Sequence, residues 1–504
     1  MIELDGHSLT LDDLVAIAHD YAPVAISSDA RARVQAARAV VDDFAERDTP
    51  TYGINTGFGS FAEVKIPHDS LSQLQVNLLR SHAAGVGEPL PVAVVRAAMA
   101  LRANVLAKGF SGIRVETLQL LVELLNRRVH PFVPSRGSVG ASGDLAPLAH
   151  MALILIGEGE VMDGMARGDA RMALAKAGLH PVTLAPKEGL ALINGTQPST
   201  ALLGLACAAA LRLARAADIA AAMSIDGLQG STKPFDVRIH AARGLEAQSM
   251  AAANLRTLLA GSGINAAHAN CGRVQDAYSM RCAPQVHGAA RAACRFAHSV
   301  FAAEANAATD NPMVFAETRE IVSGGNFHGA PVAVACDLLC IGVTQLATIS
   351  ERRSDRLVNP ALSGLPAFLT RHGGLHSGLM MAQVTAAALT SEMKTLAHPA
   401  SVDSIPTSGN KEDHVSMSMA AALKAARAVE LATRVLAVEL LCASQALDLL
   451  QPLTTSAPLS RVHDFIRSRV ATLDDDRPPA RDIDAITASI DSGELERACA
   501  VNVN

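Results

Sequence analysis

The stretch from Asp413 to Leu450 constrains the fold most, because it is long and rich in Ala and Leu. Its more solvent-exposed positions are expected at Arg427, Glu430, Arg434 and Glu439. A helix that is apolar nearly all round has to be buried on most of its faces. Similar stretches predict further long helices over residues 115–126, 199–223, 284–308 and 331–353. Because one chain cannot cover all these apolar faces, the pattern indicates burial within a large bundle and across subunit contacts.

The amino-acid composition agrees with a helical bundle. Hydrophobic residues make up 49% of the 504 residues but aromatic residues only 3%, with no Trp and three Tyr. The apolar content is therefore mostly Ala, Leu, Val and Ile, which favours long, close-packed helices. We predict a mainly α fold in two parts, a smaller mixed N-terminal region at 1–110 and a long central helical bundle at 111–504. Within these parts we expect a short helix over 28–44, a Gly-rich loop over 53–59, and loops over 160–187 and 354–375.

Charge and cysteine usage argue against several classes of partner. The net charge is −6 and no Lys/Arg cluster is long enough to follow a phosphate backbone, so nucleic acid is not expected. The most apolar stretch, 331–350, carries Asp337 and Gln345 and fits a buried bundle helix better than a bilayer span. The eight cysteines are scattered without a Cys-x-x-Cys pair, and the N-terminus lacks an apolar run of signal-peptide length. We therefore expect a cytoplasmic protein without a membrane partner.

Three small residues in a row, Ala141, Ser142 and Gly143, offer unusual chemistry. The amide nitrogen of Gly143 can reach the carbonyl carbon of Ala141, because neither residue is bulky and glycine has few backbone restrictions. Loss of one water from that ring, and of a second from Ser142, leaves a five-membered imidazolone with an exocyclic methylidene. That group is a strong electrophile, which no ordinary side chain supplies. The ordinary alternative is a Gly/Ser turn before a helix, with Asp144 as its cap.

The tripeptide belongs to one of seven sequence blocks that occur between Met1 and about residue 480. They are Tyr52-Gly-Ile-Asn-Thr-Gly-Phe-Gly59, Ser81-His-Ala-Ala-Gly85, Gly137-Ser-Val-Gly-Ala-Ser-Gly-Asp-Leu-Ala-Pro-Leu148, Lys187-Glu-Gly-Leu-Ala-Leu-Ile-Asn-Gly-Thr-Gln197, Val274-Gln-Asp-Ala-Tyr-Ser-Met-Arg-Cys282, Gly324-Gly-Asn-Phe-His-Gly329 and Glu412-Asp-His-Val-Ser-Met417. In this order the blocks resemble the aromatic amino-acid ammonia-lyases, and most closely their histidine branch.

The resemblance implies a fold, a prosthetic group and a reaction. The fold would be ammonia-lyase/fumarase-like, assembled as a homotetramer whose active sites draw on three subunits. The prosthetic group would be 4-methylidene-imidazol-5-one (MIO), formed autocatalytically from Ala141, Ser142 and Gly143. No external cofactor and no metal would be needed. The reaction would be elimination of ammonia from L-histidine to give trans-urocanate, the first step of histidine degradation.

The reaction needs a base, because a barely acidic β-proton must be removed. Tyr52 is the candidate. A Tyr has a pKa of about 10, so cationic neighbours or a dry site must activate it. The glycines around it, at 53, 57 and 59, suit a mobile lid that closes over substrate. A core Tyr before a turn is the alternative interpretation.

The substrate's other groups need partners as well. Arg281 fits the carboxylate, since a guanidinium offers a planar fork; a structural salt bridge is the alternative. Gln275, Tyr278 and Arg281 are three residues apart, so one helical face would carry all three. The resemblance implies that Tyr278 lies near the MIO and the substrate amine, and Gln275 in the surrounding network. It implies Asn194 beside the MIO oxygen and substrate carboxylate, and Phe327 flanking the MIO ring to exclude water.

Substrate choice rests on the pair Ser81-His82, which is the histidine-type pattern at the family's selectivity position. His82 and Glu412 can hydrogen-bond the two nitrogens of an imidazole, which offers one donor and one acceptor when neutral. One residue departs from the pattern: Lys411 stands where histidine-type sequences often have Gln. We expect its ammonium to reach water. If it instead enters the pocket, a modified histidine such as ergothioneine becomes the alternative substrate.

Other functions are open to this chain. A lyase acting on tyrosine or an aminomutase with the same prosthetic group would keep the same residues. A catalytically silent scaffold would be expected to lose Ser142, Tyr52 or Arg281. A metal hydrolase would draw on His372 and His376, but the two glycines between them do not favour a helix that aims both rings at one ion.

Overall fold

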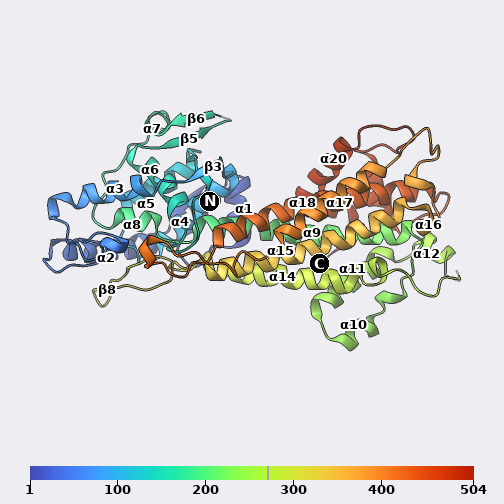
Figure 1. Cartoon of the computed structure of the whole chain (residues 1–504), viewed down its shortest axis with the longest axis horizontal. Helices are drawn as coiled ribbons and strands as arrows, with labels where there is room; N and C mark the ends of the chain where they lie inside the picture. The colour runs from blue at the N-terminus through green and yellow to red at the C-terminus, as the bar shows by residue number, and fades with distance from the viewer. Residues whose placement is uncertain (165, 270–271, 504) are drawn as a thin grey trace. The chain divides into compact units, whose positions relative to one another are not determined.

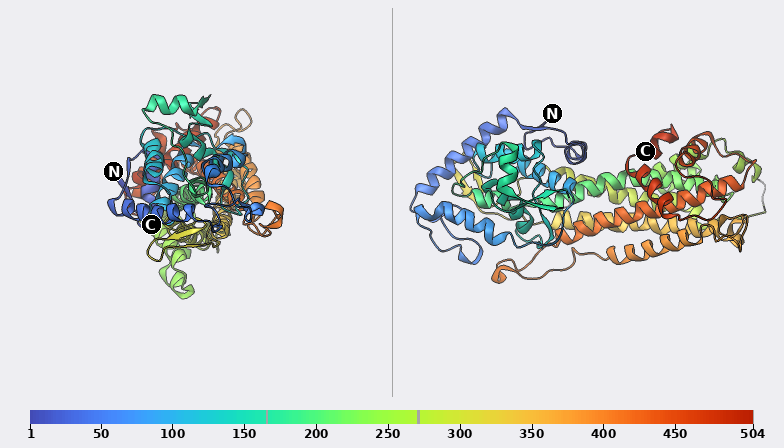
Figure 2. Two further views of the ribbon diagram at one scale, coloured as in Figure 1. Left: turned by 90° about the vertical axis from the view of Figure 1, so that its left-hand side faces the viewer. Right: turned by 90° about the horizontal axis from the view of Figure 1, so that it is seen from above.

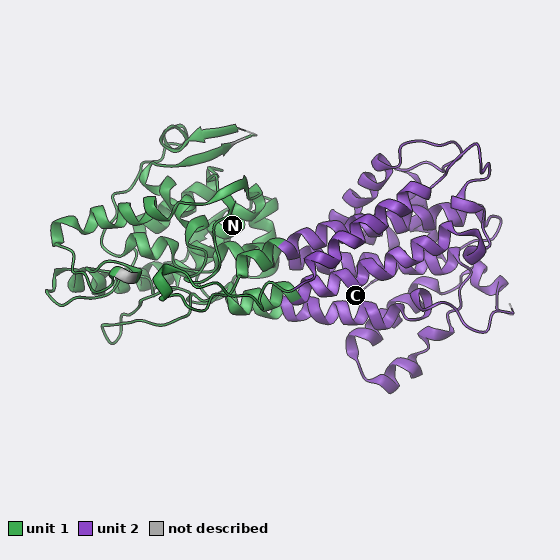
Figure 3. Ribbon diagram, viewed as in Figure 1, with its two compact units in different colours: residues 1–205, 298–337, 399–423 green, residues 206–297, 338–398, 424–504 purple. Residues whose placement is uncertain are grey.

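Helices dominate the computed structural model, which describes residues 1–164, 166–269 and 272–503 (Figure 1). The mainly α fold class predicted from the sequence is thereby confirmed. The chain divides into two compact units (Figure 3). Unit 1 holds residues 1–205, 298–337 and 399–423, and unit 2 holds residues 206–297, 338–398 and 424–504. The sequence-based boundary near residue 110 falls inside unit 1, and that division remains a prediction.

Unit 1 combines short helices with four two-stranded sheets. Its helices are α1 (Leu11–His19), α2 (Ser28–Glu46), α3 (Leu71–His82), α4 (Val92–Ala107), α5 (Val115–Asn126), α6 (Leu145–Leu153), α7 (Ala170–Ala177) and α8 (Glu188–Ile193). The sheets pair β1 (Ile2–Leu4) with β2 (Val24–Ile26) in parallel, and β3 (Val86–Pro89) with β4 (Pro134–Arg136), β5 (Glu160–Asp163) with β6 (Ala166–Asp169), and β7 (Met313–Phe315) with β8 (Glu320–Val322) antiparallel. Short 3-10 turns cover Gly59–Phe61, His68–Ser70, Ile154–Ile156 and Ser408–Asn410.

Helix α4 is buried along nearly its whole length and forms the centre of unit 1. It carries two buried arginines, and both donate hydrogen bonds to backbone carbonyls. Arg96 donates to the carbonyl oxygens of Ile17 and Leu125, at 2.9 and 3.0 Å. Arg102 donates to the carbonyl oxygen of Asn194 at 2.9 Å. A charge-assisted hydrogen bond offsets part of the cost of burying a guanidinium, so these contacts tie α4 to the segments around it.

Unit 2 is built from long helices. Four helices contribute residues to both units: α9 (Gln197–Gly227), α14 (Ala283–Glu304), α15 (Ala330–Val358) and α18 (Ser418–Leu449). The remaining helices of unit 2 are α10 (Val237–Arg243), α11 (Glu246–Leu259), α12 (Gly263–Ala267), α13 (Tyr278–Arg281), α16 (Pro360–Ser363), α17 (Met380–Leu396), α19 (Ala457–Arg467), α20 (Ala480–Asp491) and α21 (Glu494–Cys499), with 3-10 turns at Lys233–Phe235 and Ala367–Leu369. Figure 2 shows these elements from two further directions.

Buried polar contacts connect the unit 2 parts of the long helices. Glu439 on α18 accepts a hydrogen bond from Ser224 on α9 at 2.7 Å and one from Arg353 on α15 at 2.9 Å. The prediction that Glu439 is exposed to solvent was therefore wrong. Its side chain is fully buried, because Arg353 neutralises its charge inside the bundle. Arg427 and Glu430 do lie at exposed positions, where they pair with each other.

The predicted long helices agree with the structure within five residues at each end, and the largest differences are the end of α15 and the start of α18. Helix α5 has the predicted bounds. Helix α18 begins at Ser418 rather than Asp413, because Met417 adopts a left-handed backbone (φ +56) and gives its N–H to Val139. Two predicted loops contain regular structure. Residues 160–187 hold the β5–β6 hairpin and α7, and residues 354–375 hold the end of α15 and α16.

Two helices within the described ranges, α9 and α15, are long and apolar enough to cross a membrane by length and composition. In each, 72% of the most apolar window is buried inside the protein. A core helix of a bundle has this property, so α15 fits the bundle helix predicted for residues 331–350. Of the eight cysteines, six are buried thiols and Cys282 is a half-buried one, while Cys271 lies outside the described residues.

Candidate active site

The Ala141–Ser142–Gly143 tripeptide lies against Gly195 on one side. An isolated bridge pairs Gly143 with Gly195, and the N–H of Asp144 donates to the carbonyl oxygen of Gly195 at 2.8 Å. Gly143 has a φ of +73°, and a Cβ at this position would overlap the Gly195 carbonyl. Only glycine therefore fits, both for its backbone and for its lack of a side chain.

The other side of the tripeptide is held by the segment that precedes α18. The N–H of Met417 donates to the carbonyl oxygen of Val139 at 2.8 Å, and the Ser416 hydroxyl donates to the carbonyl oxygen of Gly140 at 2.8 Å. The N–H of Gly329 donates to the same Gly140 oxygen at 3.2 Å. Three segments that are distant in sequence thus fix the conformation of the tripeptide.

Asn194 contacts the tripeptide directly. Its Nδ2 donates to the carbonyl oxygen of Ser142 at 2.9 Å, and its Oδ1 is buried without a hydrogen-bond partner among the described residues. The backbone of Asn194 is held by Arg102, which also donates to Gln197 at 2.8 Å. Burial lowers the pKa of Arg102 to about 10, which still leaves it charged at neutral pH. Arg102 therefore positions Asn194.

Two helix N-termini flank the tripeptide. Helix α6 begins at Leu145, directly after Asp144, and α9 begins at Gln197, two residues after Gly195. The N-terminus of a helix carries a partial positive charge, which draws electron density from the peptide groups before it. Asp144 is fully buried, and its two oxygens accept hydrogen bonds from the Ser138 hydroxyl at 2.7 Å and the Ser199 N–H at 2.8 Å. Burial raises the pKa of Asp144.

Glu412 contacts the reactive part of the tripeptide. The Ser142 hydroxyl donates to Oε1 of Glu412 at 2.6 Å, and the Thr407 hydroxyl donates to Oε2 at 2.6 Å. Thr407 and Glu412 also form an isolated antiparallel bridge, in which the Thr407 N–H donates to the Glu412 carbonyl oxygen at 2.9 Å. The loop between them turns sharply, with left-handed backbones at Gly409 and Asn410. The carboxylate is therefore held from both of its oxygens.

His82 ends helix α3, close enough to Glu412 to feel its charge. Its Nδ1 lies 2.9 Å from the carbonyl oxygen of Leu78. A carbonyl can only accept, so the network assigns a proton to Nδ1 and leaves Nε2 as an acceptor in the neutral ring. Burial lowers the pKa of His82, while the Leu78 hydrogen bond and the negative charge of Glu412 oppose that effect.

Tyr52 lies in the turn before the Gly-rich loop. Burial raises the pKa of Tyr52, and the charge of Glu412 raises it further, while a hydrogen bond with the backbone of Gly59 lowers it. The Phe58 ring packs edge-on against the Tyr52 ring, with centroids 6.4 Å apart. The charge of Glu412, which contacts Ser142, thus acts on both Tyr52 and His82.

Two further predicted residues belong to unit 1. Phe327 is half-buried and precedes by two residues Gly329, whose N–H contacts the tripeptide segment at Gly140. Lys411 is exposed, as expected of a lysine that carries its ammonium to water.

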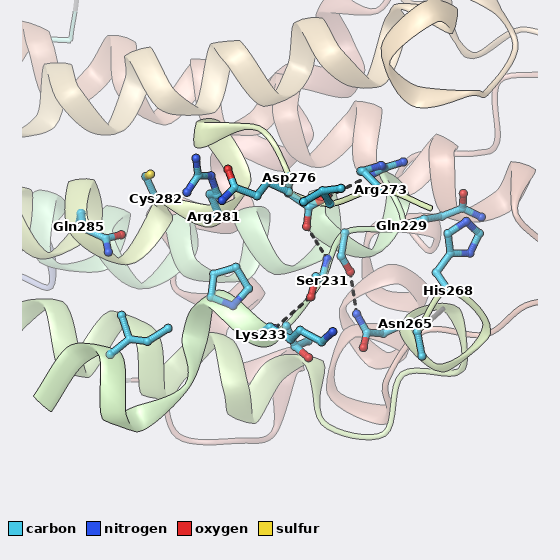
Figure 4. Close-up of a pocket in the computed structure, with 17 residues that line it drawn as sticks. Gln229, Ser231, Lys233, Asn265, His268, Arg273, Asp276, Arg281, Cys282 and Gln285 are labelled. Carbon is cyan, nitrogen blue, oxygen red and sulfur yellow. Dashed lines mark hydrogen bonds and ion pairs between the residues drawn. The ribbon is translucent and has the colours of Figure 1, made fainter. Parts of the chain in front are cut away.

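The remaining predicted residues, Gln275, Tyr278 and Arg281, lie in unit 2. Gln275 and Arg281 line a pocket of about 590 Å³, shown in Figure 4. The Arg281 guanidinium lies over the Tyr278 ring at 4.5 Å, and its Nε is buried without a hydrogen-bond partner among the described residues. Tyr278 is 70% exposed, which leaves its hydroxyl available to a group from outside this chain.

The prediction that one helical face carries these three residues was wrong. Helix α13 is a single turn from Tyr278 to Arg281, and Gln275 lies in an irregular segment before it. The Asp276 carboxylate accepts hydrogen bonds from the Ser231 N–H at 2.7 Å and from Arg273 at 3.2 Å. These contacts hold the segment in a bend, so the helical spacing does not extend to Gln275.

Sequence reasoning missed several residues that shape the site. Thr407 and Arg102 are two of them. A third is Lys187, which is fully buried with a left-handed backbone (φ +69) directly before α8, the helix that leads to Asn194. Its Nζ donates to the carbonyl oxygen of Ser111 at 2.8 Å and pairs with Asp310 at 3.5 Å. Lys187 is the first residue of one of the seven sequence blocks, but nothing in the sequence indicated that it would be buried and support Asn194.

Comparisons with known proteins agree with this architecture. The sequence profile of the family described as aromatic amino acid lyase matches residues 9–468. The histidine ammonia-lyase of Anaeromyxobacter dehalogenans is 57% identical over 502 residues, which cover 98% of this chain and 99% of that protein.

Two solved structures extend the comparison. The crystal structure of histidine ammonia-lyase from Trypanosoma cruzi is 46% identical, with a TM-score of 0.92 over 99% of this chain and 95% of that one. The tyrosine aminomutase of Streptomyces globisporus is 38% identical, with a TM-score of 0.95 over the full length of both chains. The fold is therefore shared by lyases and aminomutases. The match over most of the chain, together with the arrangement around Ser142, shows that the protein belongs to the aromatic amino acid lyase family.

Proposed function

We propose that this chain is a carbon–nitrogen lyase that eliminates ammonia from L-histidine to give trans-urocanate. The 57% identity to a histidine ammonia-lyase over nearly the whole chain supports the reaction. One observation in the site supports histidine as the substrate. His82 has a ring nitrogen that can accept a hydrogen bond, and Glu412 lies near enough for its charge to act on that ring. A phenyl side chain has no polar hydrogen to offer Nε2 of His82 or the half-buried Glu412 carboxylate, whereas an imidazole has N–H groups that match these acceptors.

The tripeptide fits the prosthetic group that this family uses. Small residues with glycine in a left-handed conformation allow a ring to close between Gly143 and Ala141. Asn194 donates to the Ser142 carbonyl oxygen, which would become the oxygen of an imidazolone formed from these three residues. Asn194 would hold the MIO together with the two flanking helix N-termini. When formed, the group supplies an electrophile that turns the substrate amine into a better leaving group. No external cofactor enters this proposal.

The chain's own residues then divide the remaining work. Tyr52 takes the β-proton, and because burial raises its pKa, the reaction should speed up toward alkaline pH. Nε2 of His82 accepts one N–H of the substrate imidazole, and the Glu412 carboxylate accepts the second N–H when that ring is protonated. Phe327 helps to exclude water.

The unit 2 residues complete the site from other subunits. Arg281 would bind the substrate carboxylate with its planar fork, and Tyr278 would approach the amine. The buried Nε of Arg281 has no hydrogen-bond partner among the described residues, and Tyr278 is largely exposed. We infer a homotetramer with shared active sites, placed in the cytoplasm, with an amino acid as its small-molecule partner and no nucleic-acid or membrane partner.

The purified protein should be incubated separately with histidine, phenylalanine, tyrosine and ergothioneine, and the conjugated product followed in the ultraviolet. We expect turnover of histidine well above the others, with Ser142→Ala folded but nearly inactive. Identification of the product separates a lyase, which releases ammonia, from an aminomutase, which returns a β-amino acid. Faster turnover of ergothioneine or tyrosine would contradict the substrate assignment, and an active Ser142→Ala would contradict the role of the tripeptide.

A further inference from the structure

We propose that Glu412 is the acid–base residue that removes the hydroxyl group of Ser142 as the tripeptide matures, and that Thr407 positions it for this step. The inference rests on the proposed function, because it takes Ala141–Ser142–Gly143 as the source of the prosthetic group. It adds a role for Glu412 that precedes any substrate.

The contact that carries the inference joins Glu412 to the atom that must leave. The Ser142 Oγ lies 2.6 Å from Oε1 of Glu412, in the part-buried hydrogen bond expected of a hydroxyl and a carboxylate. A second carboxyl group, Asp144, is adjacent in sequence, but both of its oxygens are engaged by Ser138 and Ser199. Of these two carboxyl groups, Glu412 is therefore the one in contact with the leaving oxygen.

The chemistry balances with two waters lost and no change in oxidation state. In one step the Gly143 nitrogen bonds to the Ala141 carbonyl carbon, and that carbonyl oxygen leaves as water with the amide protons of Gly143 and Ser142. In the other, the Cα–H and Cβ–O bonds of Ser142 break and a Cα=Cβ double bond forms. The Glu412 carboxylate takes the proton lost from Cα and gives it to the departing hydroxyl, which leaves as water, so the carboxylate ends unchanged.

Thr407 acts through Glu412. Its hydroxyl donates to Oε2 at 2.6 Å, so the carboxylate is oriented with Oε1 toward Ser142. The backbone bridge between Thr407 and Glu412 closes the loop that carries both residues. Removing only the Thr407 hydroxyl should leave this backbone intact while freeing the carboxylate to rotate. Thr407 is thus a positioning residue for maturation.

The test follows the mass of the chain. The wild type and Glu412→Gln are synthesised in a cell-free system, translation is stopped, and intact mass is recorded over time. Gln keeps the shape and can still accept the Ser142 hydrogen bond, but it cannot transfer a proton at a useful rate. The wild type should lose about 36 Da, two waters. Glu412→Gln should lose both waters at least tenfold more slowly than the wild type. Most of its chains should meanwhile show a mass loss of about 18 Da or less.

Three variants control the measurement. Thr407→Val should also mature more slowly than the wild type, whereas Thr407→Ser, which restores the hydroxyl, should recover the wild-type rate. Lys411→Gln changes an exposed neighbour in the same loop and should mature normally. Circular dichroism identifies any variant that does not fold; if Glu412→Gln is one, the Thr407 pair carries the test.

The outcomes separate the two proposals. Maturation of Glu412→Gln at the wild-type rate would overturn this inference and leave the proposed function standing. Equal rates for Thr407→Val and Thr407→Ser would overturn the positioning role. A wild-type chain that is active without losing two waters would instead contradict the prosthetic group, and with it the proposed function.

Discussion

His82 shows how one backbone contact decides what a side chain offers a substrate. The Leu78 carbonyl accepts a hydrogen bond from Nδ1–H, so Nε2 of the neutral ring keeps a lone pair that can accept one from a substrate. Burial lowers the pKa of His82 below its usual 6.5, against the opposing effects of Leu78 and Glu412, so the ring is neutral at pH 7. A neutral acceptor next to a carboxylate suits a ring that carries an N–H, which imidazole has and phenyl lacks.

His82→Leu should therefore weaken histidine turnover. Removing the acceptor leaves a buried N–H unpaired, which costs roughly 1–3 kcal/mol, so kcat/KM for histidine should fall about 10- to 100-fold. Activity toward phenylalanine or tyrosine should fall less or appear. Lys411→Gln is the matched control, since Lys411 is exposed in the same neighbourhood, and its effect should stay within about threefold. Unchanged histidine turnover in His82→Leu would mean that His82 is structural. A loss beyond about tenfold in Lys411→Gln would place that lysine in the pocket.

At the scale of elements, the tripeptide depends on the close approach of the loop before α6 to the segment before α18. Gly140 has a φ of +68°, and a Cβ there would overlap the hydroxyl oxygens of Ser416 and Ser418. Gly178, which ends α7, has nearly the same φ of +69° but nothing within 4 Å of its would-be Cβ. Comparing alanine substitutions at these two glycines therefore separates the cost of backbone strain from the cost of steric overlap.

Gly140→Ala should destabilise the protein more than Gly178→Ala. Both substitutions place a Cβ in a left-handed backbone, which costs about 1 kcal/mol. Only Gly140→Ala also has to push two serines away, which adds about 1–3 kcal/mol. Thermal midpoints measured at one scan rate would compare them, because large proteins often unfold irreversibly. Equal decreases in the two thermal midpoints would mean that the segment before α18 can move away from the added methyl group at little cost in stability.

The elements show where sequence reasoning succeeds and where it fails. Helix α5 was predicted to the residue because its apolar spacing alone decides it. The start of α18 was missed because a tertiary contact, Met417 to Val139, overrides helix propensity. The β5–β6 hairpin was missed although an Asp-Gly pair at 163–164, a strong hairpin signal, was present in the sequence.

Within the site, the sequence blocks predicted the residues that contact Ser142 but not the residues that hold those in place. Ser142, Asn194 and Glu412 were named from motifs, and the structure brings Asn194 and Glu412 into contact with Ser142. Thr407 could not be named, because its contact with Glu412 depends on a loop that turns through left-handed residues. Arg102 acts on Asn194 from 92 residues away, which no local pattern reveals.

At the scale of the whole molecule, the predicted site residues fall into two sets. Ser142, Asn194 and Glu412 belong to unit 1, and Tyr278 and Arg281 belong to unit 2. Around Tyr278 the chain exposes unusual apolar surface, since Val274 is 96% exposed and Tyr278 itself 70%. Surface of this kind next to a proposed substrate-binding arginine suits contact with another subunit.

Mixing two inactive variants tests this arrangement. Ser142→Ala and Arg281→Ala should each be nearly inactive alone. If each active site takes Ser142 from one chain and Arg281 from another, random assembly of equal amounts should restore about a quarter of the wild-type activity. Light scattering of the same samples should give four times the chain mass. A tetramer without recovered activity would show that both residues come from one chain.

Lys187 has a consequence for chemical labelling. An amine reagent needs an accessible, unprotonated nitrogen, and this Nζ is fully enclosed, held by Ser111 and paired with Asp310, although burial lowers its pKa. The surface lysines can be acylated in the native state, whereas Lys187 can react only when the protein opens around α8. The rate at which the reagent acylates Lys187, measured by mass spectrometry, therefore reports how often the framework beneath Asn194 opens.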